Sequence, residues 1–305
     1  MIRLDDSRAV PSERCLHYQI GDINVSITGN AEDVLDDFAA LYAGDDGRRA
    51  TPGPAIRMVV NRSRRATLGR TRYVISGDGE ELFSDRRRAE GLPYLEWGIN
   101  WRVMVRCTSY LQLHAATLSF NGQGVVLVGS SGAGKSTLAA GLISRGWTYL
   151  SDEFALIDPD TFYLHPFPKA LCIKAGSFDV IKSLHLPLWR RRHYVKAFKG
   201  PVGYVRPQDF ASNADPTPCP IRCVIFTKYT EGEEPRLYPI SPGRAAFSLA
   251  GHAFNRKVFG PRAVSILSEV VRQAECLGLV SGPIDETCNL VETLLSDAHS
   301  DCLVE

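Results

Sequence analysis

The sequence lacks any continuous apolar stretch of about 18 residues, the length that a helix needs to cross a bilayer. Its beginning, MIRLDDSRAV, also lacks the apolar core of a secretion signal. Neither sign of charge dominates, because 35 Lys and Arg residues stand against 34 Asp and Glu residues and leave a formal net charge of +1. These absences predict a cytoplasmic protein with no membrane partner and no nucleic-acid partner.

Paired cysteine motifs are absent as well. The eight cysteines form no C-x-x-C pair, and their scattered positions in a chain of 305 residues favour reduced thiols over a disulfide framework. Cys219 and Cys223 flank Pro220, but a metal site would need more ligands nearby. The sequence also contains no internal repeat and no low-complexity tract. We therefore expect an ordinary globular chain that is long enough for two domains.

The first hundred residues have the pattern of a small α+β domain. Apolar alternation and turn residues predict strands at 16–20, 23–28 and 55–61 and helices at 33–42 and 92–105. We interpret the charged stretches 62–72 and 78–88 as solvated loops. The last helix leads into a second domain, so the predicted boundary separates residues 1–105 from residues 106–305.

The second domain alternates short strands with helices. We expect strands at 113–120, 124–128, 147–150, 154–157, 171–174 and 221–226 and helices at 135–144, 242–250, 261–274 and 284–295. The Asn121-Gly122 dipeptide predicts a hairpin, so the sheet should be mixed rather than wholly parallel. The basic stretch 183–203 has weak periodicity. It fits either a lid or acceptor-binding loop beside the site, or a solvated surface loop.

The most informative stretch is GVVLVGSSGAGKST at 124–137. It joins an apolar strand to a helix through a loop of the G-x-x-x-x-G-K-S/T type, whose glycines let successive backbone N–H groups point at phosphate oxygens. The N-terminus of the following helix adds its own positive field. We therefore predict a nucleotide site formed by Gly129, Ser130, Ser131, Gly132, Ala133, Gly134, Lys135, Ser136 and Thr137.

Two carboxylates that follow this loop in the sequence are candidates for proton transfer and metal binding. Lys135 supplies a point charge for the β and γ phosphates, and the Ser136 hydroxyl can bind Mg²⁺. Asp152 and Glu153 follow the strand 147–150, which should return beside the first strand and bring both side chains near the phosphates. One carboxylate can accept a hydroxyl proton while the other holds Mg²⁺ directly or through water. A simple turn cap at Ser-Asp-Glu is the structural alternative.

The segment LHAATLSFNGQGVVLVGSSGAGKSTLAAGLISRGWTYLSDEFALI resembles the catalytic domain of HPr kinase/phosphorylase, and resembles the HPr kinase-related kinases more closely. The resemblance rests on His114 before the hairpin, on the phosphate loop, on the R-G pair after its helix and on the acidic pair. Later pieces extend it over residues 111–255, namely PFPKALCIK at 166–174, KGPVGYVRP at 199–207 and FTKY at 226–229. It implies a P-loop kinase domain of the HPr kinase C-terminal type, an α/β fold with a mixed sheet and flanking helices, preceded here by the small α+β domain.

The resemblance also implies roles for single residues. It makes Asp152 the general base for the acceptor hydroxyl and Glu153 a carboxylate on the metal side. It makes His114 a site residue near the phosphates, whereas its apolar neighbours alone would favour a core histidine. Lys174 matches a lysine of the related kinases that would face the phosphates or the acceptor. Arg206 is a candidate for neutralising transition-state charge, since a planar guanidinium suits phosphoryl oxygens.

Together these inferences predict an ATP- and Mg²⁺-dependent phosphotransferase that acts on a hydroxyl, in particular a serine of a protein or peptide. Cys172 stands where HPr kinase/phosphorylases carry the glutamate of an L-E-I-R-G signature, which argues against HPr as the acceptor and against phosphorylase activity. A small-molecule kinase on the same scaffold and a non-catalytic ATP-dependent switch are the alternatives. The resemblance also points to a homo-oligomer.

Overall fold

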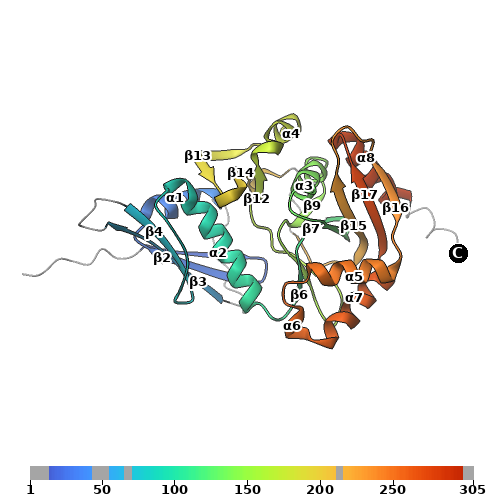
Figure 1. The fold of residues 1–305 in the computed structure, drawn as a ribbon, viewed down its shortest axis with the longest axis horizontal. Coiled ribbons are helices and arrows are strands. Elements are labelled where there is room, and N and C mark those ends of the chain that lie inside the picture. Colours follow the sequence, from blue (N-terminus) through green and yellow to red (C-terminus); the bar gives the residue numbers. More distant parts are fainter. Residues whose placement is uncertain (1–13, 43–54, 65–70, 211–215, 298–305) are drawn as a thin grey trace, which may run out of the picture.

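The computed structural model describes residues 14–42, 55–64, 71–210 and 216–297, and it shows a mixed α/β fold (Figure 1). The first part of the chain contains a five-stranded sheet with the strand order β1-β2-β3-β4-β5. Its elements are β1 (Arg14–Ile20), β2 (Ile23–Gly29), α1 (Glu32–Leu41), β3 (Ala55–Arg64), β4 (Thr71–Gly77), β5 (Glu80–Asp85) and α2 (Gly91–Arg106). Among these strands, β2 and β3 are parallel and the other neighbours are antiparallel.

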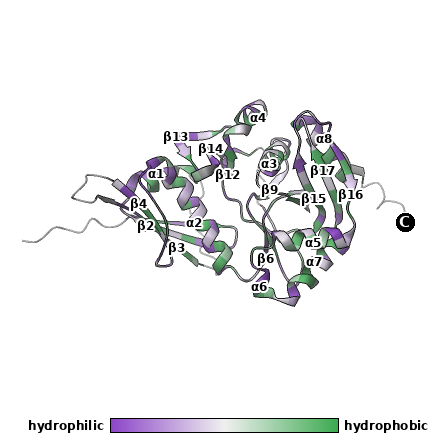
Figure 2. Cartoon of the chain, in the orientation of Figure 1, coloured by the Kyte–Doolittle hydropathy of each residue, from purple (hydrophilic) through white to green (hydrophobic). Residues whose placement is uncertain are grey.

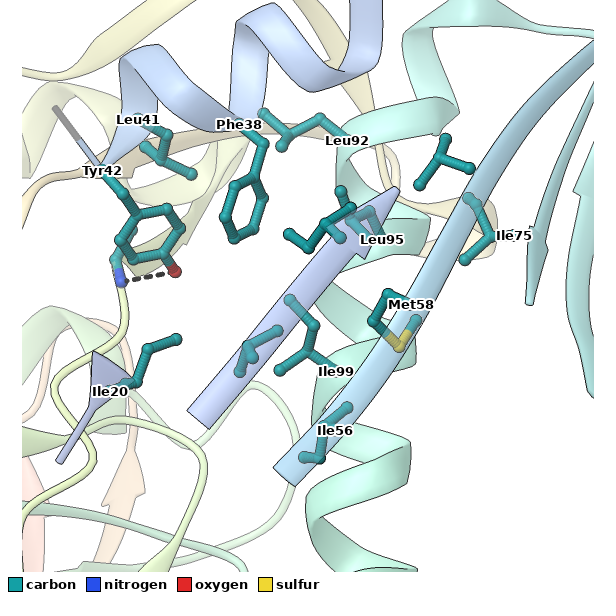
Figure 3. Close-up of a cluster of buried hydrophobic side chains, with 14 of the residues drawn as sticks. Ile20, Phe38, Leu41, Tyr42, Ile56, Met58, Ile75, Leu92, Leu95 and Ile99 are labelled. Atoms are coloured by element: carbon teal, nitrogen blue, oxygen red, sulfur yellow. Dashed lines mark hydrogen bonds between the residues drawn. The ribbon is translucent and has the colours of Figure 1, made fainter. Parts of the chain in front are cut away.

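One face of this sheet is buried under the two helices. Along β2 every second residue from Ile23 to Gly29 is buried, which is the pattern of a strand with one face in the core. Phe38 of α1 and Leu95 and Ile99 of α2 pack over that face (Figure 3). The β1–β2 turn lies against a later part of the chain, because a Cβ at Gly21 would lie only 2.0 Å from the carbonyl oxygen of Pro166. This sheet therefore packs on the rest of the molecule.

The interpretation of residues 78–88 as a solvated loop is wrong. Residues 80–85 form β5, which pairs with the unexpected strand β4 across a tight turn at Asp78 and Gly79. Both turn residues have positive φ, 46° and 87°, as a two-residue hairpin requires. Charged residues fit in β5 because it is the edge strand of the sheet. Of the other expected loop, residues 65–70 lie outside the described ranges.

The second part of the chain is built around a six-stranded sheet with the order β16-β17-β15-β8-β7-β9. Its strands are β7 (Ala115–Phe120), β8 (Gln123–Val128), β9 (Thr148–Ser151), β15 (Ile221–Tyr229), β16 (Arg236–Pro239) and β17 (Glu275–Ser281). Its helices are α3 (Lys135–Ser144), α5 (Pro242–His252), α6 (Arg256–Phe259), α7 (Pro261–Gln273) and α8 (Ile284–Asp297). Residues of α3 and α8 share one buried cluster with the sheet, and residues of α5 and α7 share another.

The expected mixed sheet is confirmed, since β8, β15 and β17 are parallel and the remaining pairs are antiparallel. The predicted hairpin at Asn121-Gly122 joins β7 to β8. β9 pairs with β7 rather than with β8. Two successive antiparallel pairings make β9 run in the direction of β8, so both strands end at the same edge of the sheet. The residues after β8 and after β9 therefore meet.

Two small sheets connect these parts. β6 (Leu111–Leu113), β10 (Ala155–Ile157) and β11 (Leu164–His165) form one, and β12 (Leu171–Lys174), β14 (Pro201–Val205) and β13 (Trp189–Val195) form the other, with α4 (Phe178–Ser183) after β12. The stretch 183–203 thus contains one complete strand, β13, and the beginning of another, β14. β13 is hydrophilic in Figure 2 and still forms a strand, because it is an edge strand on β14 and Arg192 pairs with Asp37 of α1. Within the described ranges, no helix combines the length and apolar character that crossing a membrane requires.

Candidate active site

The loop between β8 and α3 lines one end of a cavity of about 390 Å³. Gly132 and Gly134 have φ values of 92° and 88°, which side-chain-bearing residues rarely adopt. A Cβ at Gly129 would lie 2.7 Å from the carbonyl oxygen of Thr227, so that position also requires glycine. The first N–H groups of α3 have no partner within the helix. With the helix dipole they make this end of the cavity suited to an anion.

Lys135 lies over this loop. It is nearly buried, with 8% of its surface exposed, and its Nζ donates hydrogen bonds to the carbonyl oxygens of Gly129 at 2.7 Å and Ser130 at 3.2 Å. Burial lowers the pKa of this ammonium group, and the carboxylates of Asp152 and Glu153 partly offset that effect. The negative charge of a phosphate bound in the cavity would stabilise the charged form of Lys135 and so offset the effect of burial.

Asp152 lies beside the loop at the end of β9. Its Oδ2 accepts a hydrogen bond of 3.0 Å from the Ser136 hydroxyl, while its Oδ1 is buried without a hydrogen-bond partner among the described residues. Burial and the neighbouring Glu153 raise the pKa of Asp152 to about 7, although the Ser136 hydrogen bond and Lys135 act in the opposite direction. A carboxyl group that titrates near neutral pH is well matched to the work of a general base.

Glu153 has different neighbours. Its carboxylate oxygens lie 3.6 Å from Lys196 Nζ and 3.9 Å from His114 Nδ1. Burial favours a raised pKa for Glu153, but Lys196 and His114 outweigh burial and hold the pKa below its ordinary value. Glu153 therefore stays ionised and contributes to the raised pKa of Asp152. The structure places Asp152 in contact with the Ser136 hydroxyl, whereas Glu153 faces Lys196 and His114.

His114, Lys174 and Thr137, three of the residues that the sequence suggested for the site, also line the cavity. Lys174 Nζ donates a hydrogen bond of 3.0 Å to the Ser131 hydroxyl, which ties β12 to the phosphate loop. The Thr137 hydroxyl lies 2.8 Å from the Ser177 hydroxyl. Burial lowers the pKa of His114, so its imidazole is neutral at neutral pH.

Arg206 is not among the residues that line the cavity. Its guanidinium group is held by Asp209 through two hydrogen bonds of 2.7 and 2.8 Å. The structure therefore does not bring Arg206 together with the other predicted site residues, and the acidic residue three positions later was the signal for this in the sequence. Lys196 and Lys199, from the connection between β13 and β14, line the cavity instead.

Another part of the cavity lining was not predicted. It comes from the last residues of β15 and β17 and from the segments that follow these strands, namely Tyr229, Gly232, Ser281, Gly282, Pro283, Ile284 and Thr287. Two of these residues lie beside the loop, since a Cβ at Gly134 would lie 3.3 Å from Cβ of Tyr229 and 3.7 Å from the hydroxyl oxygen of Ser281. Only the folded sheet brings them to the loop, so no local motif could have identified them. The total volume is in the range of a ligand site, about 300–1,000 Å³.

A metal ion at this site would need coordinating atoms from a bound molecule in addition to those of the protein. Among the described residues, no group of three or more His, Cys, Asp and Glu side chains is placed to hold a metal ion. The Ser136 hydroxyl and the unpartnered Oδ1 of Asp152 are oxygen donors, and both belong to residues that line the cavity. Mg²⁺ is commonly held by one or two carboxylates together with substrate phosphates. The oxygen donors present therefore fit Mg²⁺ only when a phosphate ligand is bound.

The raised pKa of Asp152 predicts that Asp152→Asn stabilises the protein at neutral pH. In the folded state this carboxyl keeps its proton up to about pH 7, against an ordinary pKa of 3.8. Between these values the folded state binds more protons, so the wild-type free energy of unfolding should fall by up to about 4 kcal/mol as the pH rises. Denaturant unfolding of both proteins from pH 4 to pH 8 measures this. A difference between them that is the same at every pH would contradict the assignment.

Comparisons with known proteins give distant matches. A family model described as SynChlorMet cassette protein ScmC matches residues 100–185, from α2 to the connection that follows α4. No curated protein matches the chain. Among solved structures, the Hpr(Ser) kinase/phosphatase from Coxiella burnetii is similar to 63% of this chain and 97% of its own, with 16% sequence identity and a TM-score of 0.29. The chain therefore has a distant structural similarity to that protein.

Proposed function

We propose that this chain is an ATP-dependent phosphotransferase that moves the γ-phosphoryl group to a hydroxyl group of a protein or peptide. The observation that carries the proposal is the 3.0 Å contact between the Ser136 hydroxyl and Asp152. It places a carboxyl group with a pKa of about 7 directly beside a glycine-rich loop at a helix N-terminus. A carboxyl group that titrates near neutral pH is suited to take a proton from an acceptor hydroxyl group.

On the donor side, the loop and Lys135 would hold the β and γ phosphates. The N–H groups at the start of α3 and the Lys135 ammonium group provide the positive field. Ser136, with Asp152 close by, would hold Mg²⁺, which when bound neutralises charge on the phosphates. Lys174 reaches the loop through Ser131 and is available to a phosphate oxygen. The nucleoside would lie along the cavity lining contributed by Tyr229 and Pro283.

On the acceptor side, Asp152 would take the proton of the attacking hydroxyl. The acceptor oxygen forms its bond to the γ phosphorus while the bond to the β-phosphate oxygen breaks, and ADP leaves. Glu153 keeps its negative charge beside Asp152 and so keeps the pKa of Asp152 raised. Lys196 and Lys199 line the same cavity and can offset the charge that develops on the phosphoryl oxygens.

The surroundings of Asp152 favour a macromolecular acceptor over a metabolite. The hollow behind Asp152, which Glu96, Tyr149 and Lys169 also line, has a volume of about 10 Å³. That is the space of a single water molecule and cannot hold a sugar. A nucleotide would occupy much of the larger cavity, so the acceptor hydroxyl must approach from its mouth. A serine side chain on a peptide can do this without being enclosed.

Lys135→Ala tests the donor half of the site. Losing a charged hydrogen-bond donor to phosphate should weaken ATP binding by about 10- to 100-fold. Titration calorimetry measures the affinity, and γ-labelled ATP with the products of neighbouring genes measures transfer. We expect label on one acceptor with the wild type and none with Lys135→Ala. ATP affinity that is equal in the two proteins would refute the assignment of the loop.

A further inference from the structure

A long stretch near the end of the chain contains no acidic residue. Residues 235–268 include no Asp or Glu, while they include the basic residues Arg236, Arg244, Arg256, Lys257 and Arg262. The chain as a whole is nearly balanced, with a formal net charge of +1. This stretch is therefore a local concentration of positive charge, and the proposed donor site does not use it.

The stretch forms β16, α5, α6 and the first part of α7. Figure 1 shows the three helices grouped on one side of the six-stranded sheet, with α6 next to β6. Ala245 and Leu249 of α5 are buried against Ala263 and Ile266 of α7. The opposite side of α5 carries Arg244 and Phe247, which are three positions apart and so share one face. This outer face is open to solvent.

The aromatic and apolar residues on this side are unusually exposed. Phe247 exposes 85% of its surface, Val258 of α6 exposes 59% and Phe254, between the two helices, exposes 42%. Arg244, Arg256 and Lys257 have no acidic partner in the part of the chain that the structure describes. Leaving a large aromatic group in water gives up about 1.5–3 kcal/mol that burial would provide. Free cations beside exposed apolar groups are typical of a surface that binds a partner.

This surface is continuous with the proposed active site. The backbone N–H of His114 donates a hydrogen bond of 2.9 Å to the carbonyl oxygen of His252, at the end of α5. The ring of Phe254 lies 5.5 Å from that of His114, and His114 lies beside Glu153. Burial lowers the pKa of His252, and the charge of Lys135 acts in the same direction. Residues 252–254 thus connect the outer face of α5 to His114, which lines the cavity.

We propose that Arg244, Phe247, Phe254, Arg256, Lys257 and Val258 form a docking surface, called here the α5–α6 surface, for an acidic segment of the acceptor protein that also carries apolar side chains. The inference rests on the proposed function and names the class of acceptor. Glutamate or aspartate side chains of the segment pair with the three cations. Its apolar side chains cover Phe247 and Val258. A serine next to the segment then enters the mouth of the cavity at Phe254 and reaches Asp152.

The distance along α5 can be compared with the length of an extended peptide. From Phe247 to His252 the helix rises roughly 8 Å, at about 1.5 Å per residue. An extended peptide covers that distance with roughly three residues, at about 3.3 Å each. A short acidic motif a few residues from the serine is therefore long enough to follow α5 from Phe247 to its end beside His114. A bilayer surface fits less well, because Asp152 is only 7% exposed inside a cavity and a flat membrane cannot bring a hydroxyl group to it.

The test is a binding measurement without nucleotide. The probe is a short fluorescein-labelled peptide rich in glutamate, with leucine side chains and one serine, and its counterpart with lysine for glutamate is the control probe. The proteins are wild type, Arg244→Glu/Arg256→Glu, Phe247→Ala and Arg57→Glu. Arg57 is an exposed arginine of β3 in the other sheet, so Arg57→Glu is a matched control for reversed charge. All replaced side chains lie on the surface, and circular dichroism checks that each variant folds.

We expect the acidic peptide to bind wild type and the Arg57→Glu protein equally, and the lysine peptide to bind neither. Reversing the charges at positions 244 and 256 should weaken peptide binding at least tenfold. It should also make the affinity depend less on the salt concentration, since salt screens exposed ion pairs. Phe247→Ala should weaken binding about fivefold at every salt concentration. Equal affinity of all variants would overturn the proposal. The proposal would also be overturned if phosphatidylglycerol vesicles or single-stranded DNA bound more tightly than the acidic peptide and the same substitutions abolished that binding.

The two proposals can fail separately. If the acidic peptide binds as expected but the protein binds no ATP, the proposed function fails and the α5–α6 surface stands as a peptide-binding site. If ATP binds and is used while the surface substitutions leave peptide affinity unchanged, the surface fails and the phosphotransferase stands. The surface residues are not part of the donor site, so the charge reversal should leave ATP affinity at the wild-type value.

Discussion

Asp152→Asn is expected to slow phosphoryl transfer by about 10²- to 10⁴-fold, the usual contribution of a general base. Asparagine keeps the shape of the side chain and can still accept the hydrogen bond that the Ser136 hydroxyl donates to Oδ2. It cannot take a proton from the acceptor. ATP without Mg²⁺ should bind at least as tightly as to wild type, because the substitution removes a potential negative charge near the phosphates. Single-turnover transfer of labelled phosphate and calorimetric titration with ATP measure the two effects.

The pH dependence of phosphoryl transfer by the wild-type protein provides a second test of the proposed role. With a pKa of about 7 for Asp152, kcat/KM should fall about tenfold for each unit below pH 7 and level off above it. Glu153→Gln removes the negative neighbour that helps raise this pKa, so the fall should begin at a lower pH. Equal transfer rates for wild type and Asp152→Asn, with ATP bound in both, would remove Asp152 from the mechanism.

The sequence pointed to the loop that lines the cavity because a glycine-rich loop between a strand and a helix is a local motif. Residues 124–137 form a strand, a glycine-rich turn and a helix, and each part is set by neighbours within a few positions. The ends predicted for α3, residues 135 and 144, are those of the structure. Asp152 was predicted to lie near the loop, and the structure places its carboxyl group 3.0 Å from the Ser136 hydroxyl.

What the sequence missed depends on contacts between distant residues. β17 follows α7 directly, and its short apolar run is buried on both faces, so no alternation marks it as a strand. β13 contains three consecutive arginines, and it is a strand only because it pairs with β14 and because Asp37 of α1 accepts hydrogen bonds from Arg192. Because β13 pairs with β14, the connection between these strands brings Lys196 and Lys199 to the cavity. Their approach to Glu153 and the phosphate loop is a property of the folded sheet.

Lys169→Met is expected to destabilise the fold by about 3–5 kcal/mol, the cost of leaving a buried charge without its partner. Lys169 Nζ lies 3.0 Å from Oε2 of Glu96 in α2, and it also donates hydrogen bonds to the Glu96 carbonyl oxygen and to Asn100. Both side chains are more than nine-tenths buried. The pair joins the first sheet and its helices to the segment between β11 and β12. Denaturant unfolding at neutral pH gives the free-energy change.

A double substitution separates two quantities, the contribution of this ion pair to the free energy of unfolding and the destabilisation caused by leaving one of its charges buried alone. Glu96→Leu/Lys169→Met replaces both charges by apolar side chains of similar size, so neither charge is left buried alone. The double variant should therefore be more stable than Lys169→Met and close to wild type. The Tyr42 hydroxyl would lose Glu96 as a partner but keep the backbone N–H of Ala170, which donates to it at 3.2 Å (Figure 3). If the double variant were instead as unstable as the sum of the two single variants, Glu96 and Lys169 would act independently and the pair would not hold the two parts together.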